Sequence, residues 1–242
     1  MKKRTRIIIT AIALVLLVTG FLISQIIILS QPTKGNKITH YQNPQKAVFV
    51  IDIQEDFTGT TAKPPFPYKD SRQLIETVNK ITEAASKQGI PVIYIRQELD
   101  GFIGNLISNI FAGGISKKGN PGTEIDKRVN IVSSNIFPKL KSDAFSNQKL
   151  EEYLTANQIN ELYLTGLDAA GCVHNTALGA LNRGYAVNII QDAIVLRKVE
   201  KWEEILKQYK EENIALITTL DFVKISGSSQ NRVGLASLPA PR

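Results

Sequence analysis

Short apolar runs alternate with amphipathic segments along most of the chain, and this alternation restricts the fold more than any other feature. The run at 47–53 is continuously apolar up to its first acid, which is typical of a parallel strand covered on both faces. The pattern predicts an α/β fold: a doubly wound, mostly parallel open sheet with helices on both faces, in three α/β/α layers. The expected strands are 47–53, 91–96, 129–133, 161–165, 186–190 and 214–218, and the expected helices are 70–88, 147–156, 172–183 and 200–210.

A charge-free apolar segment precedes this pattern. No charged residue occurs from Ile7 to Ser30, and a helix of that length, at about 1.5 Å per residue, crosses the roughly 30 Å hydrocarbon core of a bilayer. We therefore predict a transmembrane signal anchor at 7–30, with the basic flank 1–6 in the cytoplasm and the rest of the chain outside it. A cleaved signal peptide is the alternative, but the run is longer than a usual signal-peptide core and no Ala-x-Ala site follows it.

Three further segments complete the predicted organisation. A polar tether at 31–46 separates the bilayer from one domain at 47–225, and residues 226–242 form a flexible tail. Between 97 and 126, Gly and Pro interrupt a stretch that still contains apolar residues. We expect an irregular loop there that acts as a lid, as a pocket wall or as a contact with a second copy of the chain in a homo-oligomer.

The basic character of the chain comes from its N-terminal end. Lys and Arg number 29 against 22 Asp and Glu, but residues 1–46 contain seven basic residues and no acidic one, leaving 22 of each in the remainder. A nearly neutral domain gives no support for nucleic-acid binding. With one cysteine, the chain cannot form an intrachain disulfide, so a free thiol is expected even in an oxidising compartment.

The only cysteine follows a strand and a tight turn. Residues 162–173 contain the end of an apolar run, a glycine-containing turn and the start of a helix at Cys172. The first turn of a helix presents unpaired N–H groups and the positive end of the helix dipole, both of which favour a thiolate. We therefore interpret Cys172 as a candidate nucleophile. A small buried hydrophobic residue is the alternative.

Asp52 is the second candidate because it lies where the strand at 47–53 breaks into polar residues. Ligands of doubly wound sheets bind outside the carboxyl ends of the strands, so Asp52 and Cys172 are expected in the same crevice. A carboxylate in this apolar setting is costly unless it is paired or used, and a structural capping role is the alternative. His40 lies in the tether, and His174 points to nearly the opposite side of the helix from the cysteine. The base for the thiol is therefore a carboxylate, a lysine, or both.

Three motifs resemble the isochorismatase-like cysteine hydrolases, a superfamily that includes nicotinamidases and N-carbamoylsarcosine amidohydrolase. The motifs are VIDIQEDF at 50–57, Lys139 six residues before Phe145, and the segment 165–173 that contains Cys172. The resemblance covers residues 46–223 and implies the isochorismatase-like form of the α/β/α fold.

The resemblance implies a catalytic triad of Asp52, Lys139 and Cys172. Asp52 is then the general base, Lys139 holds the charge of its neighbours and lowers the pKa of the thiol, and Cys172 attacks a carbonyl carbon to form a thioester. Lys141 is the rival to Lys139, whose spacing to the following phenylalanine fits the family pattern better.

The same resemblance places the backbone N–H groups of Asp168 and Cys172 in an oxyanion hole, with a cis peptide bond between Leu167 and Asp168. Asp168 stands where a small apolar or aromatic residue is common. Its carboxylate is therefore expected to turn toward a substrate donor, such as a ureido N–H or a cationic group. Two weaker candidates for substrate contact are Phe57, as a pocket wall, and Arg96, as the partner of a substrate carboxylate. For both residues a structural role is the alternative.

Two departures from the family narrow the expected activity. Nicotinamidases carry a metal site with histidines after the first strand, whereas residues 58–72 contain no His, so we expect no metal and no other cofactor. True isochorismatases lack the cysteine. We therefore predict a membrane-anchored, metal-independent amidohydrolase that cleaves a C–N bond of a small amide or carbamoyl (ureido) compound. A non-catalytic module of the same fold, which binds a small ligand or a partner, is the alternative.

Overall fold

A parallel β-sheet forms the centre of the computed structural model, which describes residues 3–63, 66, 68, 70–111 and 113–228. Within these residues the sheet has six strands in the order β3-β2-β1-β4-β5-β6, and every neighbouring pair is parallel. This order confirms the doubly wound α/β fold. The strands are β1 (Gln45–Ile51), β2 (Val92–Gln97), β3 (Ile136–Lys139), β4 (Ile159–Leu167), β5 (Ala186–Val195) and β6 (Ala215–Ile217).

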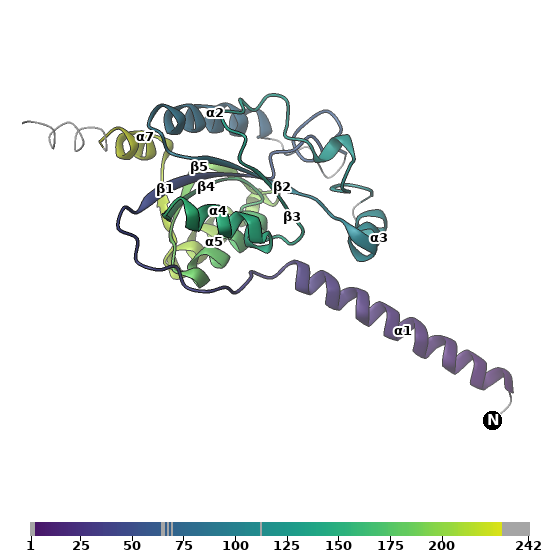
Figure 1. The fold of residues 1–242 in the computed structure, drawn as a ribbon. Coiled ribbons are helices and arrows are strands. Elements are labelled where there is room, and N and C mark those ends of the chain that lie inside the picture. Colours follow the sequence, from purple (N-terminus) through teal and green to yellow (C-terminus); the bar gives the residue numbers. More distant parts are fainter. Residues whose placement is uncertain (1–2, 64–65, 67, 69, 112, 229–242) are drawn as a thin grey trace, which may run out of the picture.

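Helices cover both faces of the sheet and bury its side chains in two cores. In β1, Ala47, Phe49 and Ile51 belong to the core beneath α4, α5 and α6, whereas Val48 and Val50 belong to the core beneath α2 and α7. The continuous apolar run is thus explained by two buried faces. Figure 1 shows α2 and α7 on one side of the sheet and α4 and α5 on the other. The helices are α2 (Ser71–Lys87), α4 (Gln148–Ala156), α5 (Cys172–Arg183), α6 (Trp202–Glu211) and α7 (Thr219–Ser228).

The segment 97–126 is not irregular throughout, so the loop expectation was wrong for part of it. It contains helix α3 (Gly101–Phe111) and the 3-10 turn η1 (Pro121–Thr123). The apolar residues of α3 recur at helical spacing, but Gly101 and Gly104 gave the sequence a turn-like appearance. Gly101 has a φ of 72°, and Gly104 packs against the backbone of Leu99. Both glycines are therefore needed for the way in which α3 begins, and they do not mark an irregular loop.

The strand expected at 129–133 is also absent from the described residues; the edge strand is β3. β3 pairs with β2 through Tyr94 and Ile136. In the segment before β3, the N–H of Val132 donates to the Tyr94 hydroxyl at 3.0 Å. A side chain of β2 thus accepts the hydrogen bond that a neighbouring strand's backbone would otherwise accept. Pro138 is compatible with β3 because β3 lies at the edge of the sheet, where a missing donor faces no neighbouring strand.

The tether is not a free spacer. The N–H and hydroxyl of Thr33 donate to Oδ2 of buried Asp143 at 2.7 and 2.6 Å, and the N–H of Ile38 donates to the carbonyl of Arg183 at 2.8 Å. Strand β1 also begins at Gln45, so it includes the last two residues of the expected tether. The segment 31–46 therefore lies along the domain and is bonded to it. The domain boundaries themselves stay predictions.

The two ends of the chain differ from the core. Helix α1 (Lys3–Leu29) extends away from the domain (Figure 1), and its stretch Arg6–Leu29 has a mean hydropathy of 2.8 with no part of it buried. It is long and apolar enough to span a membrane or to act as a signal sequence. At the other end, α7 extends to Ser228, so residues 226–228 are helical rather than part of a tail. Residues 229–242, the rest of the expected tail, lie outside the described residues.

We expect Thr33→Val to lower the free energy of unfolding by about 1–3 kcal/mol, because the carboxylate of Asp143 would lose a hydroxyl donor inside the protein. Urea denaturation of the full chain in detergent, followed by circular dichroism, measures this change. Thr33→Ser is the matched control and should unfold like the natural chain. Equal stability of Thr33→Val and the natural chain would contradict the attachment of the tether to the domain.

Candidate active site

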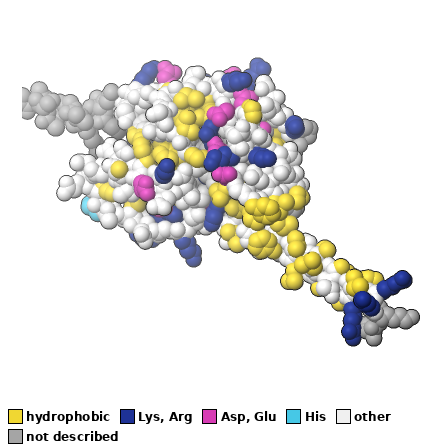
Figure 2. Space-filling model, turned by 45° about the vertical axis from the view of Figure 1, so that its right-hand side comes forward, with side chains coloured by type: hydrophobic (Ala, Val, Ile, Leu, Met, Phe, Trp, Pro, Cys, Tyr) yellow, Lys and Arg dark blue, Asp and Glu magenta, His cyan; other side chains and the backbone are white. Residues whose placement is uncertain are grey.

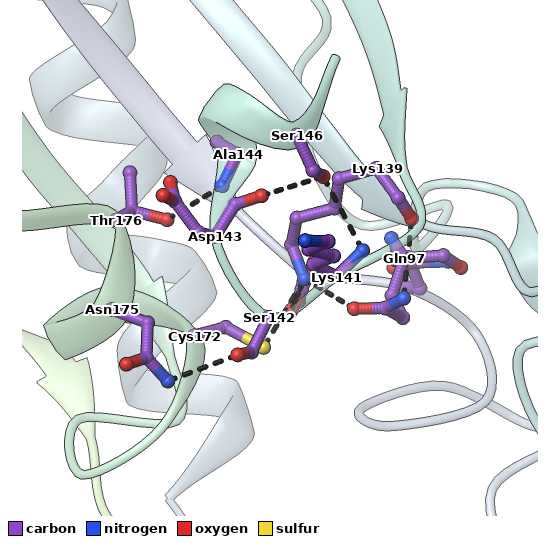
Figure 3. Close-up of polar contacts among 12 residues, drawn as sticks. Gln97, Lys139, Lys141, Ser142, Asp143, Ala144, Ser146, Cys172, Asn175 and Thr176 are labelled. Atoms are coloured by element: carbon purple, nitrogen blue, oxygen red, sulfur yellow. Dashed lines mark hydrogen bonds and ion pairs between the residues drawn. The ribbon is translucent and has the colours of Figure 1, made fainter. Parts of the chain in front are cut away.

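Asp52, Lys139 and Cys172 meet at the carboxyl edge of the sheet. Asp52 follows β1 directly, Lys139 is the last residue of β3, and Cys172 is the first residue of α5. The Nζ of Lys139 lies 3.0 Å from Oδ2 of Asp52 and 3.1 Å from Sγ of Cys172. Figure 3 shows the lysine side chain reaching the cysteine sulfur. The structure thus brings together three residues that are widely separated in the sequence.

Backbone conformation at the ends of β1 and β4 allows this approach. Asp52 has a φ of 56°, which is uncommon for a residue with a side chain, and its N–H donates to the carbonyl of Ile95 at 2.9 Å. Gly166 has a φ of 112°, and a Cβ there would lie 2.1 Å from the carbonyl oxygen of Ile51. Only glycine fits at that point, where β4 passes close to β1.

Gln97 is a fourth member of the cluster that sequence reasoning missed. Its Oε1 accepts a hydrogen bond from the Nζ of Lys139, and its Nε2 donates to the carbonyls of Lys139 and Leu140 at 3.1 and 3.0 Å. The N–H of Gln97 in turn donates to the side chain of Gln54 at 2.7 Å. The signal was its place at the carboxyl end of β2, beside Arg96, which the sequence analysis did consider.

Burial dominates the electrostatics of the cluster. The pKa of the Cys172 thiol is raised to about 12: the protein packed around the sulfur and the Asp52 carboxylate raise it, and the ammonium of Lys139 opposes them. Burial also raises the pKa of Asp52, and Lys139 opposes that shift. Burial and the Asp52 carboxylate thus outweigh the ammonium of Lys139, so the thiol pKa is raised and not lowered as expected. This shift favours the thiol form of Cys172 over the thiolate.

Lys139 stays charged in this setting. Burial by itself would lower the pKa of its ammonium, but the Asp52 carboxylate and the Cys172 sulfur together raise it. Within the described residues, Oδ1 of Asp52 has no hydrogen-bond partner although it is buried. The cluster therefore contains a cation, a thiol and a carboxylate oxygen that is free to accept a proton.

The turn before Cys172 uses the carboxylate of Asp168 internally. The peptide bond between Leu167 and Asp168 is cis, as expected. Oδ2 of Asp168 accepts from the Tyr68 hydroxyl at 3.1 Å and from the N–H of Arg197 at 2.7 Å, and Oδ1 accepts from the N–H of Ala170 at 2.9 Å. Three protein donors thus hold this carboxylate, and its expected contact with a substrate stays a prediction.

The backbone N–H groups of the turn divide into two sets. Those of Ala169 and Gly171 are used inside the protein, by the carbonyls of Val195 and Asp168, each at 2.9 Å. The N–H groups of Asp168 and Cys172, which the sequence analysis assigned to an oxyanion hole, are not among these donors. Their role in such a hole stays a prediction.

The alternative partners of the thiol lie elsewhere. The backbone N–H of Lys141 donates to Ser146 at 3.3 Å, and Lys141 lines a different cavity at the end of α1. His174 pairs with Glu212 at 2.5 Å. Of the two candidate lysines, Lys139 is therefore the one whose ammonium contacts the sulfur of Cys172. Among the described residues, no histidine contacts that sulfur.

Phe57 and Arg96 have structural partners in place. The ring of Phe57 packs edge-on against Phe66, which stacks on Tyr68, the residue that donates to the carboxylate of the turn. Arg96 forms ion pairs with Glu98 and Glu124, each at 2.6 Å. Phe57 therefore connects to the site through a row of rings, whereas the guanidinium of Arg96 is already paired.

A cavity of about 390 Å³ opens beside the turn and has a basic wall. Three of its side chains are the cations Arg197, Lys198 and Lys201, against the single acid Asp168. Since three internal donors occupy that acid, the cavity offers a net positive environment. Its lining residues are Tyr68, Asp168, Ala170, Gly171, Leu196, Arg197, Lys198 and Lys201.

The carboxylates that follow β1 are bonded within the domain. Glu55 accepts from the N–H of Thr60 at 2.9 Å, and Asp56 accepts from the N–H of Ser116 at 2.9 Å. Across the described part of the chain, no group of three or more His, Cys, Asp or Glu side chains gathers to hold a metal ion. The donor set therefore does not fit the metal site of the nicotinamidases.

Comparison with known proteins identifies the family. Residues 46–221 match the Isochorismatase domain family. The N-carbamoylsarcosine amidase of Arthrobacter sp. is 30% identical over 156 residues, which are 61% of this chain and 58% of that protein. The chain therefore belongs to the isochorismatase family of hydrolases and is related to amidases. The match thus spans just over half the length of this curated relative.

Two solved structures are similar to the domain. N-carbamoylsarcosine amidase from Thermoplasma acidophilum has a TM-score of 0.60 at 25% identity and covers 72% of this chain and 96% of that chain. Pyrazinamidase of Pyrococcus horikoshii, solved in complex with zinc, has a TM-score of 0.61 at 25% identity and covers 72% and 99%. These likenesses confirm the isochorismatase-like fold that the three motifs indicated.

We expect alkylation of Cys172 by iodoacetamide to be slow at pH 7 and to rise about tenfold per pH unit up to pH 10, because the thiolate fraction grows tenfold per unit below the raised thiol pKa. Lys139→Met removes the cation that favours the thiolate, so alkylation should slow by about tenfold or more at each pH. Mass spectrometry of the intact chain measures the rates.

Lys141→Met is the matched control for this experiment and should react like the natural chain, because its side chain lies outside the cluster. Circular dichroism verifies that each variant is folded. Fast alkylation of the natural chain at pH 7 would contradict the raised thiol pKa. Equal slowing by both lysine substitutions would contradict the assignment of Lys139.

Proposed function

We propose that this chain is a cysteine hydrolase that cleaves a C–N bond of a small amide or carbamoyl compound through a thioester on Cys172. The observation that carries the proposal is the position of the Lys139 Nζ, 3.0 Å from a carboxylate oxygen of Asp52 and 3.1 Å from the sulfur. The relationship to N-carbamoylsarcosine amidase supports a carbon–nitrogen bond as the target.

In the first half of the reaction, Asp52 takes the proton of the Cys172 thiol while the sulfur attacks the carbonyl carbon. The raised pKa of Asp52, caused by burial, makes it a stronger base than an exposed carboxylate. The tetrahedral oxyanion is held by the backbone N–H groups of Asp168 and Cys172. The carbon–nitrogen bond then breaks, the nitrogen takes the proton from Asp52, and ammonia or an amine leaves.

In the second half, water attacks the thioester carbon and gives its proton to Asp52. The carbon–sulfur bond breaks, the sulfur of Cys172 recovers the proton from Asp52, and the acid product leaves. Lys139 stays protonated throughout and stabilises the negative charge as it moves between the carboxylate and the sulfur. Gln97 holds the ammonium in this position through its side-chain oxygen.

The basic wall of the cavity beside the turn supports an anionic substrate. Arg197, Lys198 and Lys201 line it, and charge-assisted hydrogen bonds to a carboxylate are the strong contacts such side chains make. Arg96, by contrast, is already paired with two glutamates. We therefore assign recognition of a substrate carboxylate to Arg197 and its neighbours. Phe57, whose ring is joined through Phe66 to Tyr68 in the cavity wall, supports that wall from behind.

The length and apolarity of α1 support an anchored protein. The basic residues before the helix favour a cytoplasmic N-terminus. The proposed substrate is then a small metabolite outside the cytoplasm.

Ammonia release from a panel of small amides and ureides, with and without a carboxylate, tests the proposal on the full chain in detergent. We expect Cys172→Ala and Asp52→Asn to lower kcat by about a thousandfold or more. Arg197→Gln should raise KM about tenfold for carboxylate-bearing substrates and leave uncharged ones unchanged. Lys141→Met is the control with full activity.

Equal turnover by Cys172→Ala and the natural chain across the panel would refute the proposal that this chain is a cysteine hydrolase. Binding of panel compounds without any turnover would favour the non-catalytic module instead. If Arg197→Gln raises the KM for uncharged substrates as much as the KM for carboxylate-bearing ones, the proposed anionic substrate class is refuted. The proposed triad is not affected by that result.

A further inference from the structure

The end of α1 is attached to the domain without a gap. The carbonyl of Leu29 accepts from the N–H and hydroxyl of Ser142 at 2.8 and 3.1 Å, and the carbonyl of Ser30 accepts from Asn175 at 3.0 Å. The 24 residues of Arg6–Leu29 extend about 36 Å as a helix, slightly more than the roughly 30 Å hydrocarbon core of a bilayer. If α1 is inserted, as proposed above, the surface around Ser142 therefore lies at the level of the lipid headgroups.

Exposed apolar side chains occur on this same side of the domain. Helix α3 contains no charged residue, and Phe102 and Ile110 are 80% and 58% exposed. Leu140, next to Lys139, is 42% exposed. Figure 1 places α3 on the side of the domain where α1 ends, and Figure 2 shows hydrophobic side chains gathered where α1 joins the domain. A soluble surface seldom exposes such a group of side chains without a partner.

Unpaired lysines accompany the apolar group. A cavity of about 630 Å³ at the end of α1 is lined by Ile28 together with Lys34 and Lys141, and neither lysine forms an ion pair with a described residue. The two other charged residues of this cavity, Glu151 and Arg183, neutralise each other in an ion pair. The cavity is therefore net positive at the depth where lipid phosphates lie.

We propose that this membrane face, formed by α3, Leu140 and the cavity of Lys34 and Lys141, docks on a leaflet that contains anionic phospholipid. The apolar side chains of α3 enter the boundary between headgroups and acyl chains, as those of interfacial helices do. The two lysines meet the phosphates. A second copy of the chain suits this face less well, because the lysines of two copies would repel each other and α1 leads directly into lipid.

Docking has a consequence for the site. Leu140 lies between Lys139 of the buried cluster and Lys141 of the membrane face, and Gln97 holds the carbonyls of Lys139 and Leu140. The segment that places the ammonium is therefore the same segment that contacts the bilayer. The domain is held in one orientation on the membrane instead of moving freely on a tether.

A tryptophan placed on the membrane face tests the docking in the full chain, reconstituted in vesicles of phosphatidylcholine and phosphatidylglycerol. Phe102→Trp is made in a Trp202→Phe background, which removes the only natural tryptophan. Leu220→Trp in the same background is the matched control, since Leu220 is 71% exposed on α7, at the far end of the domain from α1 (Figure 1). Circular dichroism verifies folding. If Trp202→Phe fails to fold, Phe102→Trp and Leu220→Trp are made in the natural chain instead, and the fluorescence of Trp202 is subtracted.

Lipids brominated on their acyl chains should quench the fluorescence of Phe102→Trp about twofold and leave that of Leu220→Trp unchanged. Added Lys34→Gln and Lys141→Gln should remove the dependence of this quenching on phosphatidylglycerol. Quenching of Phe102→Trp by aqueous iodide and not by brominated lipid would overturn the proposal. Protection from both quenchers would also overturn it, in favour of a second copy as the occupant.

Alkaline extraction of the same vesicles separates two kinds of failure. A chain that stays in the membrane while Phe102→Trp is not quenched by lipid refutes the docking and leaves the anchor intact. A chain that is released refutes the insertion of α1 on which the docking depends. Neither result bears on turnover by Cys172, which is measured independently.

Discussion

Burial of the Lys139 ammonium is the condition on which the carboxyl edge of the sheet depends. A buried cation is tolerated only when anions and polar acceptors surround it, and here the acceptors are Asp52, Gln97 and the sulfur of Cys172. Each lies at a terminus of a different element, so β1, β2 and β3 must end, and α5 must begin, at one point. The order β3-β2-β1-β4 of the parallel sheet achieves this, because parallel strands point all their carboxyl ends the same way.

The same burial determines how the thiol is used. A cysteine at a helix start is often activated as a thiolate, but here desolvation and the neighbouring carboxylate together raise the pKa of Cys172 to about 12 against the opposing ammonium of Lys139. The thiol form is therefore favoured, and in the reaction proposed above the proton leaves the sulfur only when the sulfur attacks a carbonyl carbon. Asp52, whose own pKa is raised by burial, is suited to receive that proton at the moment of attack.

The segment that follows α1 is continuous with this architecture. Thr33 bonds to Asp143, whose other oxygen accepts from the N–H of Phe145 at 2.9 Å. Ser142 bonds to the last carbonyl of α1. The loop after Lys139 is therefore held from the inside by Gln97 and from the outside by the end of the apolar helix. The apolar helix and the cluster of Asp52, Lys139 and Cys172 are thus connected through one short stretch of chain.

The sequence by itself determined the alternation of strands and helices, the positions of Asp52 and Cys172 and the apolar N-terminal helix, because local periodicity and the carboxyl-edge rule require no knowledge of distant contacts. The family resemblance favoured Lys139 over Lys141 by its spacing to Phe145, but no local pattern shows which ammonium reaches Asp52 and Cys172, because those residues are distant in the sequence. Tertiary structure decided that choice. It also decided the role of Gln97, the packing of the tether and the raised thiol pKa, since each depends on burial that remote segments supply.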